Sequence, residues 1–300
     1  MRTRAALFFT FFPFLISILG GHAWAASSAS STDPGLATFR ITTGEVHVAI
    51  SAVTRRNQAV TELTTNDFVL LRDGEPVREI VSFGKHQQSP FSALVLTDVS
   101  ESMQPGLALE RDAAQWLRVN SDPTRDELIF LDFGLQVEPT NHQTGTHLTS
   151  LYDSLIQTLP RVATLGPGRR ALILLSDGDD NTSYHALSEV IGMAQKFDVA
   201  IYAVTAHPSR KQYVSEDVLQ KMTTETGGKF YQVRKPRDME AALLAIRAEL
   251  TNGYELVFRP DSANAGMHQL TVHSLDGRLK FCYRTAYFQP EGSRIQVAIQ

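Results

Sequence analysis

The chain has 300 residues, of which 43% are apolar and 20% are charged, and its formal net charge is −4. This composition is that of a globular protein with a sizeable core, and the mild acidity argues against nucleic acid as the partner. Cys282 is the single cysteine, which excludes a disulfide framework.

The first 25 residues have the pattern of a secretory signal peptide. Arg2 and Arg4 give a positive start, residues 5–21 are almost uninterruptedly apolar, and Ala23-Trp-Ala25 offers a small-residue cleavage site. A retained membrane anchor is the alternative, but Pro13 interrupts a run that ends before the roughly 20 residues of a span. We therefore expect a signal peptide over residues 1–25 and an extracytoplasmic protein, periplasmic or secreted.

Residues 26–35 have the composition of a linker, and a region of alternating apolar and polar residues follows over 36–88. A similar pattern returns over 253–300, where strands are expected at 254–258, 268–273 and 279–288. Each end contains an Asp-Gly pair that is typical of a hairpin turn. Neither end alone offers enough area for a core, so we expect the two to join in one β sandwich.

The central part, residues 89–252, alternates strand patterns with amphipathic helix patterns. This alternation predicts an α/β domain with a doubly wound, mostly parallel sheet. The expected strands cover 91–97, 127–133, 171–175, 199–204 and 229–233, and the expected helices cover 106–119, a segment from 149, segments through 187–194 and 218–222, and 239–250.

Oxygen-bearing side chains stand at three points where strands end or helices begin. Asp98, Ser100 and Ser102 follow the first strand, Thr149 opens a helix, and Asp177 follows the strand over 171–175. Ligands of an open α/β sheet bind at the carboxyl ends of its strands, so these residues are expected to meet. Hydroxyl and carboxylate oxygens suit a hard divalent ion, Mg²⁺ first, with Mn²⁺ or Ca²⁺ as alternatives.

The three segments together resemble the von Willebrand factor type A (VWFA) family and its metal-ion-dependent adhesion site. The matching strings are FSALVLTDVSESM, TSLYDSL and ALILLSDGDDN. The resemblance covers about residues 89–252, and the flanking β segments are similar to an exported bacterial group of VWFA proteins.

The resemblance implies a role for each site residue. Ser100, Ser102 and Thr149 would give hydroxyl oxygens to the ion, whereas Asp98 and Asp177 would act largely through bound water. An Asp or Glu carboxylate of a partner protein would then complete the shell of the ion.

Some positions depart from the family pattern or leave a choice open. Glu101 stands where a small residue is common. The sequence does not decide whether its charge aids or opposes the binding of an acidic ligand. Asp179 and Asp180 are expected in a solvated turn. Thr144 and Thr146 are alternatives to Thr149 as the ligand, since spacing alone does not decide.

These features predict a non-enzymatic, metal-dependent protein-binding module for adhesion or complex assembly. A structural subunit of a cell-envelope complex is the alternative. A metal-assisted hydrolase is a weaker one, because the chain has neither Gly-x-Ser-x-Gly nor a glycine-rich phosphate loop.

Overall fold

The computed structural model describes residues 44–56, 58–104, 106–140, 147–166, 168–206, 214–260 and 264–291. All of them belong to one compact unit, residues 41–300. The expected signal peptide and linker, as well as Thr144 and Thr146, lie outside the described residues. No helix in the described ranges is both long enough and apolar enough to span a membrane.

A six-stranded sheet forms the centre of the α/β domain, in the order β10-β9-β8-β5-β6-β7. All neighbours are parallel except the edge pair β6 and β7. All eight residues of the central strand β5 are buried, as expected of a parallel strand covered on both faces. The strands are β5 (Phe91–Asp98), β6 (Glu127–Phe133), β7 (Val137–Pro139), β8 (Arg169–Leu175), β9 (Ala200–Thr205) and β10 (Phe230–Gln232).

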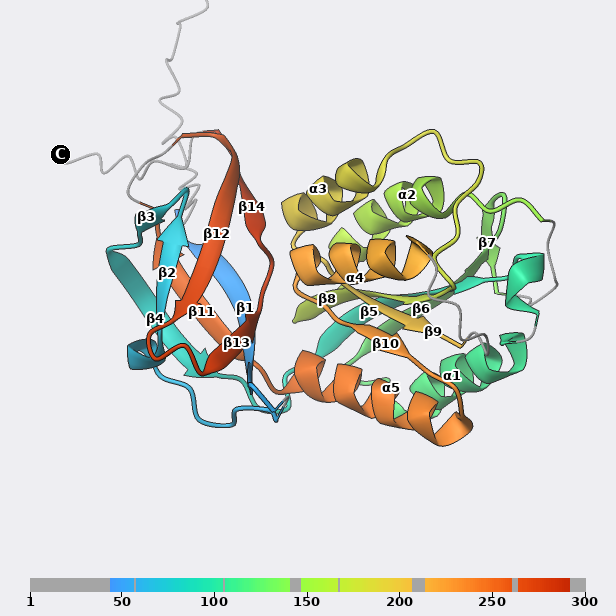
Figure 1. The fold of residues 1–300 in the computed structure, drawn as a ribbon, viewed down its shortest axis with the longest axis horizontal. Helices are drawn as coiled ribbons and strands as arrows, with labels where there is room; N and C mark the ends of the chain where they lie inside the picture. Colours follow the sequence, from blue (N-terminus) through green and yellow to red (C-terminus); the bar gives the residue numbers. More distant parts are fainter. Residues whose placement is uncertain are drawn as a thin grey trace, which may run out of the picture. The chain divides into compact units, whose positions relative to one another are not determined.

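Helices cover both faces of this sheet (Figure 1). The helices α2, α3 and α4 pack on one face, where Leu155 contributes to a core with Leu94 and Leu172. On the other face, α1 and α5 pack over Val95 and Ile173. The helices are η2 (Glu101–Met103), α1 (Leu107–Asn120), α2 (Leu151–Ala163), α3 (Leu187–Phe197), α4 (Val214–Thr226) and α5 (Pro236–Thr251).

The helix α5 shows how the sequence sets these elements. Met239, Leu243, Ile246 and Leu250 are buried at helical spacing and form one apolar stripe. Burying each such side chain stabilises the fold by about 1.5–3 kcal/mol. The helix begins three residues before the predicted start because Pro236 is tolerated in the first turn, where its missing N–H breaks no intrahelical bond.

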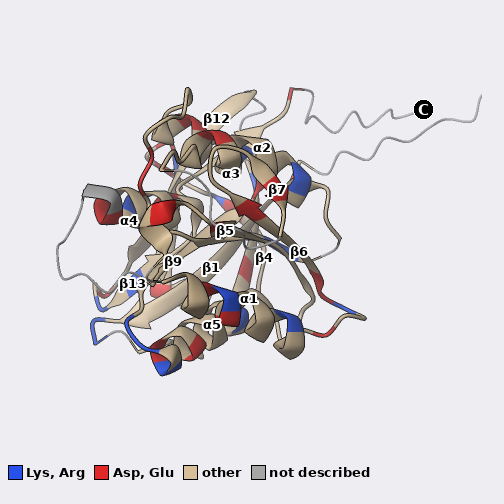
Figure 2. Cartoon of the chain, turned by 90° about the vertical axis from the view of Figure 1, so that its right-hand side faces the viewer, with Lys and Arg blue, Asp and Glu red and all other residues tan. Residues whose placement is uncertain are grey.

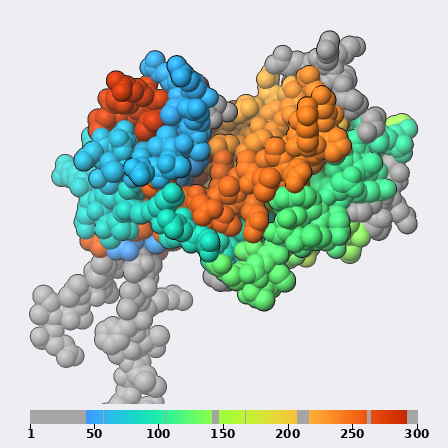
Figure 3. Space-filling model, turned by 90° about the horizontal axis from the view of Figure 1, so that it is seen from below, coloured from blue at the N-terminus to red at the C-terminus, as the bar shows by residue number. Residues whose placement is uncertain are grey.

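Two four-stranded antiparallel sheets flank the α/β domain, in the orders β13-β1-β11-β4 and β14-β12-β2-β3. Each combines strands from both ends of the chain, and Figure 3 shows the blue and red surfaces of these ends side by side. The two sheets share one apolar core. The elements are β1 (Val46–Thr54), η1 (Thr65–Asp67), β2 (Phe68–Arg72), β3 (Glu75–Pro76), β4 (Glu79–Lys85), β11 (Tyr254–Arg259), β12 (Gly266–Ser274), β13 (Leu279–Cys282) and β14 (Ala286–Gln289).

The last predicted strand, residues 279–288, is in fact two strands. β13 pairs with β1 in one sheet, and β14 pairs with β12 in the other. Between them the backbone of Thr285 donates to Glu225 O and accepts from Leu270 N, so the chain crosses from sheet to sheet. Otherwise the predicted fold class is confirmed: a doubly wound, mostly parallel sheet with flanking β-sandwich segments.

Candidate metal site

The strand order places a crevice between β5 and β8. These strands are neighbours, but the chain leaves β5 toward β6 on one side and leaves β8 toward β9 on the other. At such a reversal the two following loops separate, and the carboxyl edge opens for a ligand. Asp98 is the last residue of β5, and Asp177 stands two residues after the end of β8.

The loop after β5 is tightly held. Asp98 is completely buried; its Oδ1 accepts from Ser100 N at 2.9 Å, and its Oδ2 accepts from Ser176 Oγ at 2.7 Å. The Oγ atoms of Ser100 and Ser102 lie 3.1 Å apart in a hydrogen bond. The short helix η2 then buries Met103, which anchors the loop below. Two hydroxyls and one carboxylate thus have fixed positions at the strand tip.

Thr149 is buried and held by the loop after β8. Its N–H donates to Asn181 Oδ1 at 2.9 Å, and its carbonyl accepts from Asn181 N at 3.1 Å. Thr149 and Ser102 line one depression of about 300 Å³, which is also lined by Glu101, His147, Asp179 and Asn181. The two hydroxyl residues from different loops therefore face the same space.

Asp177 is connected to the loop after β5 through the neighbouring residue Ser176. Ser176 Oγ accepts from Gly178 N at 3.0 Å while it donates to Asp98. The turn continues with Gly178 at φ +85°, a conformation that favours glycine. Asp177 Oδ1 accepts from Asp179 N at 3.1 Å.

All five predicted site residues thus lie at one edge of the sheet. Asp98, Ser100 and Ser102 are linked directly, Thr149 shares the depression with Ser102, and Asp177 is linked through Ser176. Within the described ranges, no direct hydrogen bond joins Thr149 or Asp177 to the other three.

The electrostatics of this edge are dominated by buried acids. Burial raises the pKa of Asp98 to about 7, against the hydrogen bonds from Ser100 and Ser176, and the charge of Asp177 adds to the rise. Burial and the charges of Asp98 and Asp177 raise the pKa of Glu110 well above its ordinary value. Among the residues that the structure describes, none of these three acids forms an ion pair. Buried charge of one sign needs a proton or a cation.

The donor set fits a hard divalent cation. The oxygens come from hydroxyls and carboxylates, which Mg²⁺, Mn²⁺ and Ca²⁺ prefer to nitrogen or sulfur. Among the described residues, no group of three or more His, Cys, Asp or Glu side chains is placed to hold a metal, so an ion here depends on Ser and Thr hydroxyls. The two Glu110 oxygens, buried and without a partner, point to a missing positive charge.

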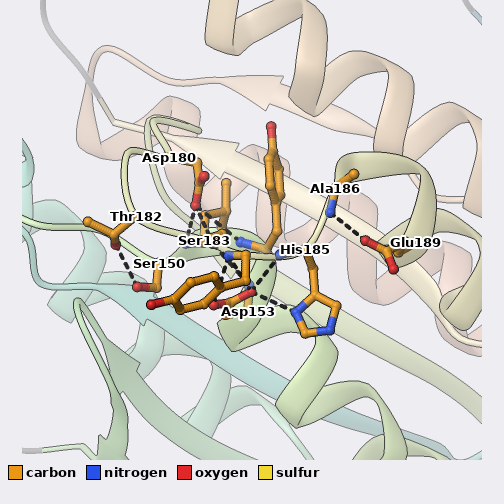
Figure 4. A network of polar contacts seen from close by, with 11 residues as sticks. Ser150, Asp153, Asp180, Thr182, Ser183, His185, Ala186 and Glu189 are labelled. Atoms are coloured by element: carbon orange, nitrogen blue, oxygen red, sulfur yellow. Dashed lines mark hydrogen bonds and ion pairs between the residues drawn. The ribbon is translucent and has the colours of Figure 1, made fainter.

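A polar network supports the site from behind (Figure 4). Asp180 Oδ1 accepts from Leu151 N at 2.8 Å and from Ser183 Oγ at 2.5 Å, so the acid caps α2. The expectation of a solvated turn for Asp180 is therefore wrong, because its carboxylate binds the orphan N–H of a helix start. Asp153 in turn accepts from His185 N and His185 Nδ1 at 3.0 and 2.7 Å.

Glu101 is paired at the rim of the depression. Its Oε2 lies 2.7 Å from His147 Nε2, and both side chains are at least half exposed. Glu101 therefore has a histidine partner at the rim of the depression. His147 lies 46 residues away along the chain, and no local pattern links the two.

The burial of Glu110 is missed when only the apolar residues of the sequence are used to predict the buried face of α1. Leu107, Ala114 and Leu117 are buried on α1, and Glu110 shares their stripe at spacings of three, four and seven. The spacing is the signal that places this acid against the sheet.

No family model matches the sequence, and no curated protein matches it. Many solved structures are similar in fold, including the following three. A von Willebrand factor type A protein from Catenulispora acidiphila is 13% identical over 76% of this chain and 74% of that one, with a TM-score of 0.45. Proximal thread matrix protein 1 from the mussel byssus is 11% identical over 64% and 51%, with a TM-score of 0.46. The SpRpn10 VWA domain is 12% identical over 51% and 93%, with a TM-score of 0.36.

Proposed function

We propose that this chain binds a divalent cation, Mg²⁺ before Mn²⁺ or Ca²⁺, and uses it to engage a carboxylate of a partner protein. In this proposal Ser100, Ser102 and Thr149 bind the ion directly, and Asp98 and Asp177 act through bound water. The observation that carries the proposal is the set of buried acids, without a base among the described residues, beside hydroxyls that line an open depression.

The chain's own residues prepare the site in two ways. Asp98 is oriented by two hydrogen bonds, so its position is fixed before any ion arrives. Ser102 and Thr149, which line the depression, supply neutral hydroxyls, and these leave part of the ion's charge unsatisfied when it is bound. An incoming carboxylate provides the strongest remaining bond for that charge.

The depression also limits what can enter. A volume of about 300 Å³ lies at the lower end of the range for ligand pockets, so the depression accommodates the end of a side chain but not a large substrate. On the side drawn in Figure 2, blue Lys and Arg segments and red Asp and Glu segments both occur along the described parts of the ribbon. The formal net charge of −4 supports a protein partner over a nucleic acid.

A thermal-shift titration with Mg²⁺, Mn²⁺ and Ca²⁺ tests the ion, with the wild type beside Ser100→Ala. A cation that binds only the folded state stabilises it by about 2.7 kcal/mol at 100 times Kd. We expect a saturable rise in Tm for the wild type, none for Ser100→Ala, and a full rise for Ser121→Ala. Ser121 bonds the carbonyl of Leu117 at the far end of α1 and serves as the control. A wild type whose Tm does not change with any of the three cations would refute cation binding.

The partner is tested separately. We expect a partner recovered by affinity capture to be released by EDTA and to be lost with Asp98→Ala. Binding that survives both changes would contradict the metal-dependent mode. A complex that stays assembled after the metal is removed would favour a structural subunit instead.

His147 favours a metal-assisted hydrolase as the second candidate. Its imidazole lines the depression and is paired with Glu101, an arrangement that can orient a general base. Turnover of esters or phosphoesters that disappears in both Asp98→Ala and His147→Ala would establish this activity. We expect none.

The proposed location is outside the cytoplasm. The support is the sequence pattern of residues 1–25. Cell fractionation with N-terminal sequencing tests it: we expect the mature chain to begin at about residue 26, and an unprocessed cytoplasmic chain would contradict it.

A further inference from the structure

Glu110 is a buried acid that the predicted metal site does not use. It lies in the first turn of α1, four residues after the N-cap residue Gly106. Its side chain is completely buried, and neither carboxylate oxygen has a hydrogen-bond partner. Leaving such a group unpaired destabilises the folded protein, and more so when the group is ionised. An acid at this position therefore needs an explanation.

The surroundings of Glu110 offer no base. The next turns of its helix stripe, Ala113 and Leu117, pack into an apolar core with Phe91 and Val95 of β5. The groups that act electrostatically on Glu110 are Asp98 and Asp177, and both are acids. Glu110 is thus within electrostatic reach of two acids of the predicted site, and among the described residues none of the three has an ion pair.

The site consequently has two layers. The outer layer consists of the residues lining the depression, among them Ser102 and Thr149. The inner layer consists of Asp98 and Glu110, which are both completely buried and do not line the depression. A partner reaches the outer layer only, so the inner acids act on whatever the outer layer holds.

We propose that Glu110 is a third carboxylate of the cation site, and that it stabilises the bound ion and orients its hydration shell from the interior of the domain. The inference rests on the proposed function and deepens it. It explains why both Glu110 oxygens lack protein partners: their partners are supplied with the cation. Glu110 is a positioning residue in this account, because it touches the ion's shell and not the partner.

Mn²⁺ and Mg²⁺ titrations followed by calorimetry test the inference, with the wild type beside Glu110→Gln. We expect Glu110→Gln to weaken binding of either ion by about 10–100-fold, the range for groups that orient a metal's ligands. We also expect its Tm without metal to equal or exceed that of the wild type, because the amide removes a buried unpaired carboxylate. A purely structural residue would not give these opposite changes.

Two further variants complete the test. Glu249→Gln changes an acid of α5 that is paired with Lys229, and it should bind both ions as the wild type does. Glu110→Asp keeps the charge on a shorter side chain, and it should recover part of the affinity that Glu110→Gln loses.

The outcomes separate the two proposals. A wild type that binds no divalent ion would refute the metal site itself. A wild type that binds the ion, beside Glu110→Gln and Glu110→Asp with unchanged Kd, would overturn the role of Glu110 alone and leave the metal site standing.

Discussion

The acids at the two edges of the parallel sheet differ in whether the chain supplies them with a base. At the amino edge, one largely buried acid and one exposed acid each have a base from the chain itself. Glu249 pairs with Lys229 just before β10, and Asp198 pairs with Arg284 at 2.7 Å just before β9. Such pairs need nothing from solution to satisfy their charges.

At the carboxyl edge the two most deeply buried acids are without an ion pair. Asp98 and Glu110 are completely inaccessible, and no base of the described residues meets them. Charge that a fold does not neutralise internally must be neutralised from outside, or by protonation. The difference between the edges teaches that folding alone supplies bases to these amino-edge acids, whereas the buried acids of the carboxyl edge keep their charge only with a cation, which is the role of the proposed ion.

The largest expected effect comes from removing one charge at the carboxyl edge. Asp98→Asn keeps the shape of the side chain but removes the carboxylate that Ser100 and Ser176 orient. We expect Mg²⁺ affinity to fall by at least about 100-fold, the upper end for losing a group that orients metal ligands. Calorimetry measures it, with Asp122→Asn in an exposed turn as the control. Equal Mg²⁺ affinities of the wild type and Asp98→Asn would contradict the proposed difference between the two edges.

The next effect tests the amino edge. Lys229→Met leaves Glu249 without its base, and the Glu249 side chain is only 17% exposed. Breaking a fully buried pair costs about 3–5 kcal/mol, and the part exposure of Lys229 reduces the expected loss to about 1–2 kcal/mol. Urea unfolding measures it, and Mg²⁺ affinity should not change.

The double variant Lys229→Met, Glu249→Gln is the control, since it removes the acid that was left unpaired. It should recover most of the lost stability. A double variant that is as unstable as Lys229→Met would mean that packing, not charge, holds this edge.

A smaller effect is expected where a helix cap supports the site. Asp180→Ala removes the acceptor for Leu151 N at the start of α2, close to Thr149. We expect a loss of about 1 kcal/mol of stability and a fall of about 10-fold in Mg²⁺ affinity.

The matched control is Glu189→Ala, which removes the acceptor for Ala186 N at the start of α3. It should cost similar stability without changing Mg²⁺ affinity. If both variants lose affinity equally, general loosening of the helices and not the position of Thr149 controls the site.

The smallest effect is a pH dependence in the sandwich. Burial acts to raise the pKa of Glu255, but hydrogen bonds and charges of His47 and His86 lower it overall. A lowered pKa in the folded state stabilises the protein above the ordinary value of 4.5, and this contribution is lost as the pH falls through the folded value. The side chain is 36% exposed, so we expect less than about 1 kcal/mol.

Urea unfolding of the wild type and Glu255→Gln from about pH 6 to about pH 3 measures this difference, which follows the carboxylate titration. The variant should be the less stable one above the ordinary pKa, and the two curves should converge in acid. A constant gap between them would show that the titration of Glu255 does not contribute.

The grouping of residues at the carboxyl edge was more predictable from sequence than the contacts that hold those residues in place. Asp98 and Asp177 each follow a buried apolar strand, and parallel strands end at one edge, so a local pattern was enough to group them. The cap that Asp180 gives to α2 joins residues 29 positions apart, which no local pattern records. The break between β13 and β14 also left no signal, because residues 279–288 contain neither Gly nor Pro.

Glu110 lies between these cases. Its spacing from Ala114 and Leu117 was visible, but an acid in the first turn of a helix is ordinarily a solvated partner of the helix dipole. Only the packing of α1 on the sheet shows that Glu110 is a buried acid and not a solvated one at the helix start.

The most direct test of the cation site is a crystal structure of the protein grown with Mn²⁺, with diffraction recorded at the manganese absorption edge. The account predicts one anomalous peak among the oxygens of Ser100, Ser102 and Thr149, with Asp98 and Glu110 behind it. A peak elsewhere, or no peak at saturating Mn²⁺, would contradict the account.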